Sequence, residues 1–291
     1  MTAGPAGADD RLVARADPAL LARVRDLATR RMVFLAGLPG TGKSLLVHQV
    51  SHLARAAGRA IHLLQWDVAR PAFEASAAGQ RYPVVGGVTH VVVRKAVGLW
   101  VRDAVARWNE RHAGPEHVLL GETPFVGNRL VELARREDDA AEPLLAAPSC
   151  RFVVAVPSVA VRRFLEARRE ERAARPLHAR EREDAPPAVL RDLWRQLAEV
   201  ARGQGIDATA ETYEPNAYRR VYERILRWRH VDTVALDAIL PTDRLSVYDF
   251  ATPPSEVVPT EAEAERFIRE VERRSPDVSA LERDAARWWV S

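Results

Sequence analysis

A glycine-rich stretch that ends in a lysine and a serine offers the clearest chemistry in this sequence. Gly37, Gly42, Lys43 and Ser44 fit the pattern G-x-x-x-x-G-K-[ST] of a phosphate-binding loop. Glycines let such a loop turn its backbone N–H groups toward phosphate oxygens, the lysine reaches the terminal phosphates, and the serine hydroxyl binds the accompanying Mg²⁺. The residues expected to hold the nucleotide are Gly37, Leu38, Pro39, Gly40, Thr41, Gly42, Lys43, Ser44 and Leu45.

The residues on either side of this loop predict the elements that would position it. Residues 32 to 35 are apolar and predict a buried strand, and residues 45 to 58 predict an amphipathic helix. A helix that begins at the loop turns the positive end of its dipole toward a bound anion. A chance match to the pattern is the alternative, and the order of strand, loop and helix favours nucleotide binding over it.

A carboxylate and a guanidinium follow the second predicted strand, residues 60 to 66. Asp67 and Arg70 leave the carboxyl end of this strand, where parallel sheets place their ligands. In phosphoryl transfer to a hydroxyl, Asp67 could orient the nucleophile and take its proton, while Arg70 could neutralise an anionic substrate or the moving phosphate. The alternative, in which Asp67 only caps the turn before Pro71, remains open.

The third predicted strand, His117 to Gly121, ends at another acidic residue, Glu122. At this position a phosphate-loop enzyme holds its metal-bound water or a substrate hydroxyl, so we expect Glu122 to bind Mg²⁺ with Ser44 and to contact the substrate. Asn128 and Arg129 are expected to start the next helix at the same edge, with Arg129 orienting the substrate. The alternative role for Glu122 is that of a helix cap.

Two later strands are predicted at residues 231 to 237 and 244 to 250. They contain Asp237 and Asp249, which are rivals of Glu122 for the metal. We rank both lower, because the metal-binding carboxylate is expected on a strand that follows closely after the phosphate loop.

Arginines gather after the fourth predicted strand, residues 151 to 157. They suit a mobile lid that closes on a triphosphate, excludes water and stabilises the charge in transit. A lid needs only two or three arginines, so most of the run is expected to be a solvated helix face, and Arg163 and Arg168 are the catalytic candidates. The lid is expected within a helical insertion at about residues 159 to 230.

Helical patterns account for most of the remaining chain. Trp100 and Trp108 occupy one face of such a pattern and are expected to lie in the core, not to stack on bases. Thr260 and Glu263 predict a capping box at the start of a late helix. Other helices are predicted at residues 91 to 112, 187 to 203 and 215 to 229.

Length and composition favour one elaborated α/β domain over residues 1 to 291, of which 47% are apolar. The net charge is only +3, and Lys43 and Lys95 are the only lysines. A GC-rich genome produces such an arginine bias without functional pressure, so the composition does not favour nucleic-acid binding. The histidines are scattered along the sequence, and we expect no metal cluster of the zinc type.

A single cysteine, Cys150, excludes an internal disulfide and fits a reducing cytosol. Residues 1 to 10 are small and acidic without an apolar leader, and no stretch approaches the length of a membrane span. We therefore expect a soluble, cytoplasmic protein without a membrane partner. The oligomeric state stays open.

Four segments together resemble the layout of P-loop small-molecule kinases. These are GLPGTGKS at the loop and WDVARPAF, HVLLGETPF and VVAVPSVAVRRFLEARRE at the next three strands, within roughly residues 32 to 175. The chain is most similar to zeta-toxin-like and chloramphenicol-phosphotransferase-like kinases, and more distantly to nucleoside and nucleotide kinases. The resemblance implies a P-loop NTPase fold with a parallel sheet of about five strands between helices, ATP with Mg²⁺, Asp67 as the catalytic base, and lid arginines on the phosphates.

The sequence thus predicts an ATP-dependent phosphotransferase that moves the γ-phosphate to a hydroxyl of a small molecule, such as a nucleoside, a sugar nucleotide or an antibiotic. The alternative, from another class, is an AAA-like ATPase or nucleotide-dependent switch that acts on a protein partner. Such an ATPase should carry an apolar strand that ends in Asp-Glu, followed by a sensor asparagine, whereas HVLLGE supplies one carboxylate.

Overall fold

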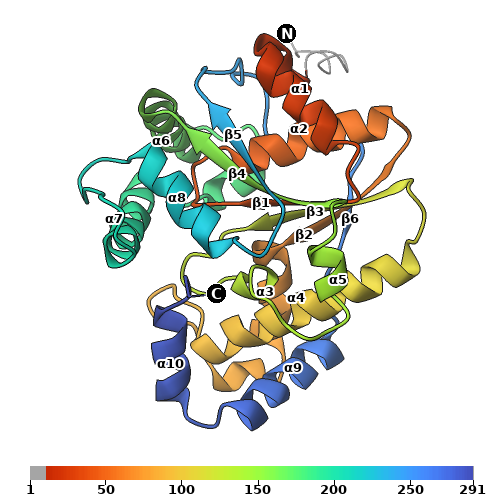
Figure 1. Ribbon diagram of the computed structural model, residues 1–291, viewed down its shortest axis with the longest axis vertical. Helices are drawn as coiled ribbons and strands as arrows, with labels where there is room; N and C mark the ends of the chain where they lie inside the picture. The colour runs from red at the N-terminus through yellow and green to blue at the C-terminus, as the bar shows by residue number, and fades with distance from the viewer. Residues whose placement is uncertain (1–10, 291) are drawn as a thin grey trace.

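The computed structural model describes residues 11 to 290, which fold around one parallel β-sheet flanked by helices (Figure 1). Within this part of the chain six strands lie in the order β5-β4-β1-β3-β2-β6, and each adjacent pair is parallel. The predicted α/β class is confirmed, and the sheet exceeds the expected five strands by the short β6. The strands are β1 (Met32–Ala36), β2 (Ala60–Gln65), β3 (His117–Thr123), β4 (Cys150–Pro157), β5 (Val231–Leu236) and β6 (Ser255–Glu256).

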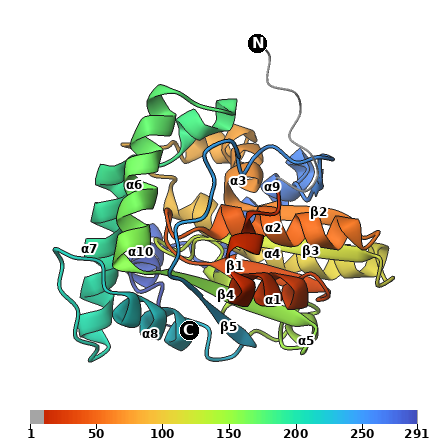
Figure 2. The same ribbon diagram turned by 90° about the horizontal axis from the view of Figure 1, so that it is seen from above.

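Helices cover both faces of the sheet (Figures 1 and 2). On one face α1 packs on α2, and on the other α3, α4 and α9 pack together, with α10 against α4. The group α6, α7 and α8 lies on the left side of Figure 1, where α8 packs on β4. The helices are α1 (Pro18–Leu27), α2 (Lys43–Ala56), α3 (Trp66–Ala75), α4 (Val91–Arg111), α5 (Glu142–Leu145), α6 (Val159–Ala174), α7 (Pro187–Gly203), α8 (Pro215–Ile225), α9 (Glu261–Arg274) and α10 (Val278–Ala286).

The alternation of side chains along each strand divides the core into two halves. In β1, Val33 and Leu35 are buried on the side of α1 and α2, while Met32, Phe34 and Ala36 are buried on the side of α4 and α8. Successive side chains of a strand point to opposite faces, so a strand that is covered on both faces must be apolar throughout. The continuous apolar run of β1 is therefore what a strand in the centre of the sheet requires.

Two predictions of local structure are wrong. Residues 244 to 250 form turns and no strand. Asn128 and Arg129 start no helix, because the backbone turns left-handed on either side of Arg129: φ is 68° at Gly127, 62° at Asn128 and 61° at Leu130. Glycine and asparagine adopt this conformation at low cost, so the segment forms a tight turn after β3 instead of a helix.

Several predicted helices are confirmed to within a few residues. The pattern over residues 91 to 112 corresponds to α4, and its Trp100 and Trp108 are buried in the core with 0% and 2% exposure. Thr260 and Glu263 form the predicted capping box of α9, in which each side chain accepts a hydrogen bond from the other residue's backbone N–H. The tryptophans of α4 are therefore unavailable for stacking on bases.

A buried ion-pair network fastens the connection between β3 and β4. Arg102 of α4 is 3% exposed and donates hydrogen bonds to Asp139 and to Glu142 of α5. Arg229, also buried, donates to both carboxylate oxygens of Glu142 at 2.8 and 3.0 Å. Partial burial acts to raise the pKa of Glu142, but the hydrogen bonds from Arg229 and Arg102 outweigh it and hold this pKa at about 2, below its ordinary 4.5.

Replacing Glu142 by glutamine should destabilise the fold by about 3 kcal/mol at pH 7, the low end of the range for breaking a buried ion pair. Because the pKa of Glu142 is lower in the folded state, its contribution is fully present above pH 4.5 and is lost as the pH falls toward about 2. Urea unfolding at pH 7 and pH 3 should therefore show a difference from the natural chain that shrinks at the lower pH. Asp138→Asn, at a neighbouring exposed carboxylate, is the matched control and should change stability by less than about 0.5 kcal/mol. An equal loss in both variants would contradict the network's role.

The one cysteine of the chain lies inside the sheet. Cys150 is the first residue of β4 and is fully buried. Burial raises the pKa of its thiol to about 12, so the thiolate form needed for nucleophilic or redox chemistry is not available at neutral pH.

Across residues 11 to 290, none of the helices is both long and apolar enough to traverse a lipid bilayer. The sequence-based inference on residues 1 to 10 lies outside the described residues.

Candidate functional site

Residues 37 to 44 connect β1 to α2 through a turn that glycines adopt readily. Gly37, Gly40 and Gly42 have φ values of 143°, 71° and 90°, in a region that costs other residues roughly 1–2 kcal/mol each. The turn follows the carboxyl end of β1, and α2 begins directly after it at Lys43. The first N–H groups of a helix lack intrahelical acceptors, so this turn combines free backbone donors with the positive end of a helix dipole.

Three polar side chains of the predicted site meet beside this turn. The Ser44 hydroxyl donates to the two carboxylate oxygens of Glu122 at 3.2 and 3.1 Å. Nζ of Lys43 lies 3.6 Å from Oε1 of Glu122 and donates to the Leu38 carbonyl at 2.9 Å. Burial lowers the pKa of Lys43, while the charge of Glu122 opposes that shift. A buried cation, a hydroxyl and a carboxylate thus share one place at the carboxyl edge of β1 and β3.

The rival carboxylates lie elsewhere. Asp237 follows β5 and is exposed. Asp249 is exposed too, and its carboxylate lies 3.8 Å from Arg11 near the N-terminal end of the described chain. Neither residue lines the cavity at the glycine-rich turn, whereas Glu122 does. The position of Glu122 near the end of β3, next to β1 in the sheet, is what brings it to Ser44.

A cavity of about 130 Å³ opens at the glycine-rich turn, between α6 and residues 242 to 248. Three arginines of α6 line it, of which Arg168 is a predicted residue and Arg169 and Arg172 were not singled out from the sequence. Arg163 does not line the cavity and is exposed. The other residues that line the cavity are Gly40, Gly42, Lys43, Ser44, Leu45, Glu122, Leu165, Glu181, Asp184, Thr242, Leu245, Val247 and Tyr248.

Residues 242 to 248, which we call the covering segment, are held over the cavity by α6 and its neighbours. The Arg168 guanidinium bonds to the Asp243 carboxylate. Arg172 donates to the carbonyls of Thr242 and Asp243 at 3.3 and 2.8 Å. The Tyr248 hydroxyl donates to Asp184 at 2.8 Å. The cavity is smaller than the roughly 300–1,000 Å³ of pockets that bury drug-sized ligands, and the covering segment forms one of its walls.

The glycine-rich turn is braced from behind by a residue that sequence reasoning missed. Arg162, 2% exposed, donates to the Pro39 carbonyl at 2.7 Å and to Glu166 at 2.9 Å. Tyr218 of α8 lies so close to Gly37 that a Cβ there would overlap its hydroxyl. The sequence places Arg162 among many arginines, and only its burial distinguishes it from them. Both residues position the turn instead of facing the cavity.

Asp67 and the two predicted substrate arginines, Arg70 and Arg129, do not line this cavity. Asp67 occupies the first turn of α3, because α3 begins at Trp66 directly after β2, and its side chain is exposed. Burial lowers the pKa of Arg129, the charge of Asp67 opposes that shift, and the charge of Arg70 adds to it. Asp67 also acts on Lys43, whose pKa it helps to raise against the effect of burial. Asp67 therefore lies within electrostatic reach of both Lys43 and Arg129.

A further arginine joins this group. Arg94, in the first turn of α4, donates to the Gly127 carbonyl at 2.6 Å. Burial lowers the pKa of Arg94, the charge of Arg129 lowers it further, and the charge of Glu282 opposes both. Arg70 is paired with Glu74 at 2.9 Å, but across residues 11 to 290 no carboxylate lies within ion-pair distance of Arg94 or Arg129. No sequence motif points to Arg94, since only the fold brings α4 to the turn after β3.

Two other hollows, of about 610 and 280 Å³, lie around residues 136 to 142. The charged residues that line them are mainly acidic, and of these Asp139 already accepts hydrogen bonds from Arg102. Neither is lined by residues of the glycine-rich turn. We therefore take the cavity at the glycine-rich turn as the candidate site.

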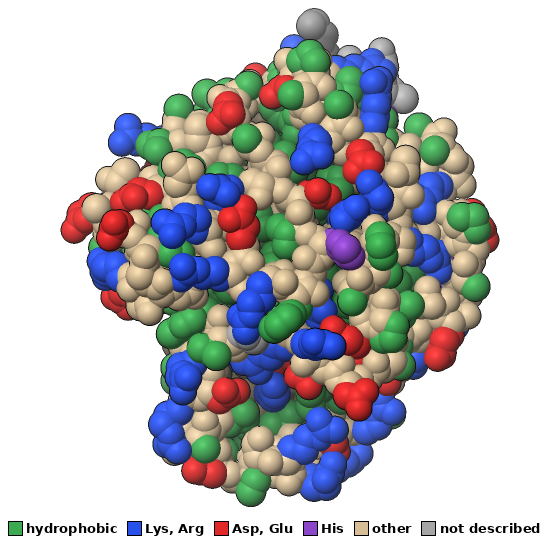
Figure 3. Space-filling view, in the orientation of Figure 1, with side chains coloured by type: hydrophobic (Ala, Val, Ile, Leu, Met, Phe, Trp, Pro, Cys, Tyr) green, Lys and Arg blue, Asp and Glu red, His purple; other side chains and the backbone are tan. Residues whose placement is uncertain are grey.

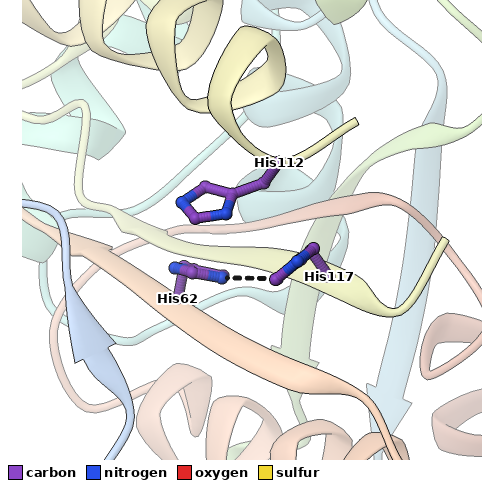
Figure 4. A group of neighbouring side chains, drawn as sticks. All are labelled: His62, His112 and His117. Carbon is purple, nitrogen blue, oxygen red and sulfur yellow. Dashed lines mark hydrogen bonds between the residues drawn. The ribbon is translucent and has the colours of Figure 1, made fainter. Parts of the chain in front are cut away.

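Three histidines meet at the amino end of the sheet: two are five residues apart in the sequence, and the third comes from a different strand (Figure 4). They are His62 in β2, His112 just after α4, and His117 at the start of β3. One ring nitrogen of each lies within 4.8 Å of the other two. The premise that the histidines lie scattered is wrong in the fold, because the parallel pairing of β2 with β3 brings His62 to His112 and His117, in a group that could hold a metal ion.

Comparison of the chain with models of known protein families, with curated proteins and with solved structures finds no match in any of the three. The chemistry of the site itself is therefore the basis for assigning a function.

Proposed function

We propose that the protein is an ATP-dependent phosphotransferase of the P-loop class that acts on a hydroxyl of a small molecule. The observation that carries the proposal is the meeting of Lys43, Ser44 and Glu122 at a turn with left-handed glycines, where a helix begins at the carboxyl edge of a parallel sheet. This arrangement supplies backbone donors, a cation and hard oxygen ligands in one place, which is what a polyphosphate with Mg²⁺ requires.

The proposed roles follow from the chemistry of each group. The backbone N–H groups of residues 40 to 44 and the Lys43 ammonium would hold the β- and γ-phosphates, since the Gly37 N–H donates to the Thr123 carbonyl and Pro39 has none. The Ser44 hydroxyl and the Glu122 carboxylate are oxygen ligands of the kind that Mg²⁺ prefers, and they already lie 3.1 to 3.2 Å apart. When bound, the metal ion neutralises charge on the β- and γ-phosphates. The nucleotide would extend toward the cavity between α6 and the covering segment.

The residues around Asp67 support a hydroxyl acceptor. Asp67 would orient the acceptor hydroxyl and take its proton. The half-buried guanidinium groups of Arg94 and Arg129 have no carboxylate partner among the described residues, which favours an acceptor that carries a negative charge, as a sugar nucleotide does. Arg168, Arg169 and Arg172 of α6 would stabilise the charge on the transferred phosphoryl group once Asp243 releases Arg168.

Replacing Glu122 by glutamine should weaken the binding of Mg²⁺. The amide keeps one oxygen but removes the charge, so the Mg²⁺ concentration needed for half-maximal turnover should rise about tenfold or more. A titration of turnover against Mg²⁺ at saturating ATP measures this shift. Asp237→Asn, at an exposed rival carboxylate, is the control and should leave the titration unchanged. If Asp237→Asn shifts the titration and Glu122→Gln does not, the metal role belongs to β5.

The direct test is a titration of the full chain with ATP and Mg²⁺ by calorimetry, followed by a screen of hydroxyl compounds for ATP consumption. Sugar nucleotides and nucleosides come first, with their uncharged parent compounds as matched controls. Transfer of labelled γ-phosphate to an acceptor supports the proposal, and absence of ATP binding overturns it. ATP hydrolysis that no acceptor accelerates, but that a protein partner does, would favour the AAA-like ATPase or switch.

The face shown in Figure 3 has no continuous basic stripe, because basic and acidic side chains are interspersed over it. A nucleic-acid groove requires a continuous basic stripe along the backbone path. A binding assay with DNA and RNA at low and moderate salt checks this inference, since any electrostatic binding weakens steeply with salt.

A further inference from the structure

We propose that His62, His112 and His117 form a binding site for a transition-metal ion, with Zn²⁺ as the expected occupant, at the amino end of the sheet. This site is independent of the proposed nucleotide site. His117 begins β3 and Glu122 lies five residues further along the same strand, which places the two sites about 17 Å apart.

The three imidazoles lie close enough together to bind one metal ion. Nε2 of His62 and Nδ1 of His117 are 3.1 Å apart, within a few tenths of an ångström of the roughly 3.3 Å that separates two ligands in a tetrahedral zinc site. The ring centroids of His62 and His112 are 4.2 Å apart, and those of His112 and His117 are 4.6 Å apart. Figure 4 shows the His112 ring facing the other two from the end of α4.

The two rings in hydrogen-bond contact can both become ligands without losing a proton. In the metal-free cluster one of the two facing nitrogens carries the hydrogen of the bond between His62 and His117. Moving that hydrogen to the other nitrogen of the same ring frees both lone pairs for the metal ion. For His117 the other nitrogen, Nε2, lies 3.6 Å from a carboxylate oxygen of Glu116. A carboxylate that accepts from the far nitrogen of a ligating histidine is the usual outer partner of a zinc site.

The surroundings leave one side of the cluster open. His62 is 7% exposed and packs edge-on against Trp108. His112 and His117 are partly exposed, which leaves access for an ion and a water molecule as the fourth ligand.

Nearby positive charges oppose binding. Arg59 donates to the His117 carbonyl at 3.4 Å, and the charge of Arg111 acts on His112. The Arg31 guanidinium lies over Trp108 and donates to the carbonyls of Gly114 and His117. Its charge repels a cation, and the carboxylate of Glu116 offsets it in part. The same hydrogen bonds fix the connection between α4 and β3, so the positions of His112 and His117 are set before an ion arrives. The inferred role is structural, because the ion would tie this connection to β2.

Metal binding can be measured without any activity assay. The full chain, with no polyhistidine tag, is titrated with Zn²⁺ by calorimetry, and the metal retained after gel filtration is counted. One zinc per chain is expected, with a rise in Tm of about 5 °C at a free zinc concentration about 100 times Kd. Co²⁺ in place of Zn²⁺ should give the strong visible absorption of a tetrahedral site. A chain that retains no metal and shows no Tm shift overturns the proposal.

Variants assign the metal to this cluster and not to Ser44 and Glu122. The double variant His62→Gln and His117→Gln should lose the zinc and the Tm shift, whereas His230→Gln, outside the cluster, should keep both. Glu116→Gln alters only an exposed carboxylate, so it should fold even if the double variant does not, and it should weaken zinc binding about 10–100-fold. Zinc binding at full strength in Glu116→Gln, together with an unchanged stoichiometry in the folded double variant, would contradict the assignment.

Discussion

Replacing Lys43 by alanine is expected to lower the affinity for ATP with Mg²⁺ about 100-fold and to abolish measurable phosphoryl transfer. The substitution removes the one ammonium at the glycine-rich turn, and hydrogen bonds to charged groups contribute about 1.5–3 kcal/mol each. Calorimetric titration with ATP measures the affinity, and release of ADP in the presence of an acceptor measures turnover. Circular dichroism should show an unchanged fold, since burial of this cation is itself unfavourable.

The control for Lys43 is an arginine that shares the basic character of the region without facing the cavity. Arg175 ends α6 and its side chain is exposed. Arg175→Ala should leave ATP affinity within about twofold of the natural chain, because an exposed charge in water contributes little at a distance. Wild-type affinity in Lys43→Ala, or an equal loss in both variants, would show that the turn does not bind phosphates.

Replacing Asp67 by asparagine should separate nucleotide binding from transfer. The amide keeps the size of the side chain but cannot accept the proton of the acceptor hydroxyl, and loss of a general base costs about 10²–10⁴ in kcat. ATP affinity should stay within about twofold, because Asp67 forms no ion pair with Lys43 and lies outside the cavity. Steady-state kinetics with the accepted substrate, combined with an ATP titration, measure both quantities.

Asp249→Asn is the matched control for Asp67. Its carboxylate is exposed near Arg11, so the substitution should leave kcat unchanged. If kcat is also unchanged in Asp67→Asn, then Asp67 serves only as an acidic residue in the first turn of α3, where it would stabilise the helix by about 0.3–1 kcal/mol. A comparison of the thermal unfolding of the two variants would detect that lesser role.

The glycine-rich turn and the elements around it could be predicted because their signals are local. The apolar run of β1, the glycines at positions with positive φ, and the capping box at Thr260 each depend on residues that are neighbours in sequence. The parallel sheet follows from the repeated order of strand and helix. β6 could not be predicted, since two residues carry no periodicity.

The spacing of the arginines in α6 indicates which of them share one side of the helix. Residues in a helix are separated by about 100° each, so Arg168, Arg169 and Arg172 fall on one side of α6. Arg163 falls on nearly the opposite side, and it is exposed while the other three line the cavity. Helical phase alone therefore argues against pairing Arg163 with Arg168 in one lid.

Long-range contacts set the limit of sequence reasoning for this chain. Arg94 reaches the turn after β3 only because α4 crosses that face of the sheet. The histidine cluster depends on the pairing of β2 with β3, because only this pairing brings His62 to His112 and His117, which are five residues apart in the sequence. Residues 244 to 250 have the composition of a strand but form turns over the cavity instead.

Because Cys150 is buried inside the sheet, the reactivity of its thiol can measure how often the folded protein opens globally. As the sole thiol, it lies at the start of a central strand with no exposed surface and a strongly suppressed thiolate. A thiol reagent can therefore label the protein only when the sheet comes apart. The labelling rate, followed by mass spectrometry under native conditions, would report how often the whole core opens and how far bound ATP or zinc suppresses that opening.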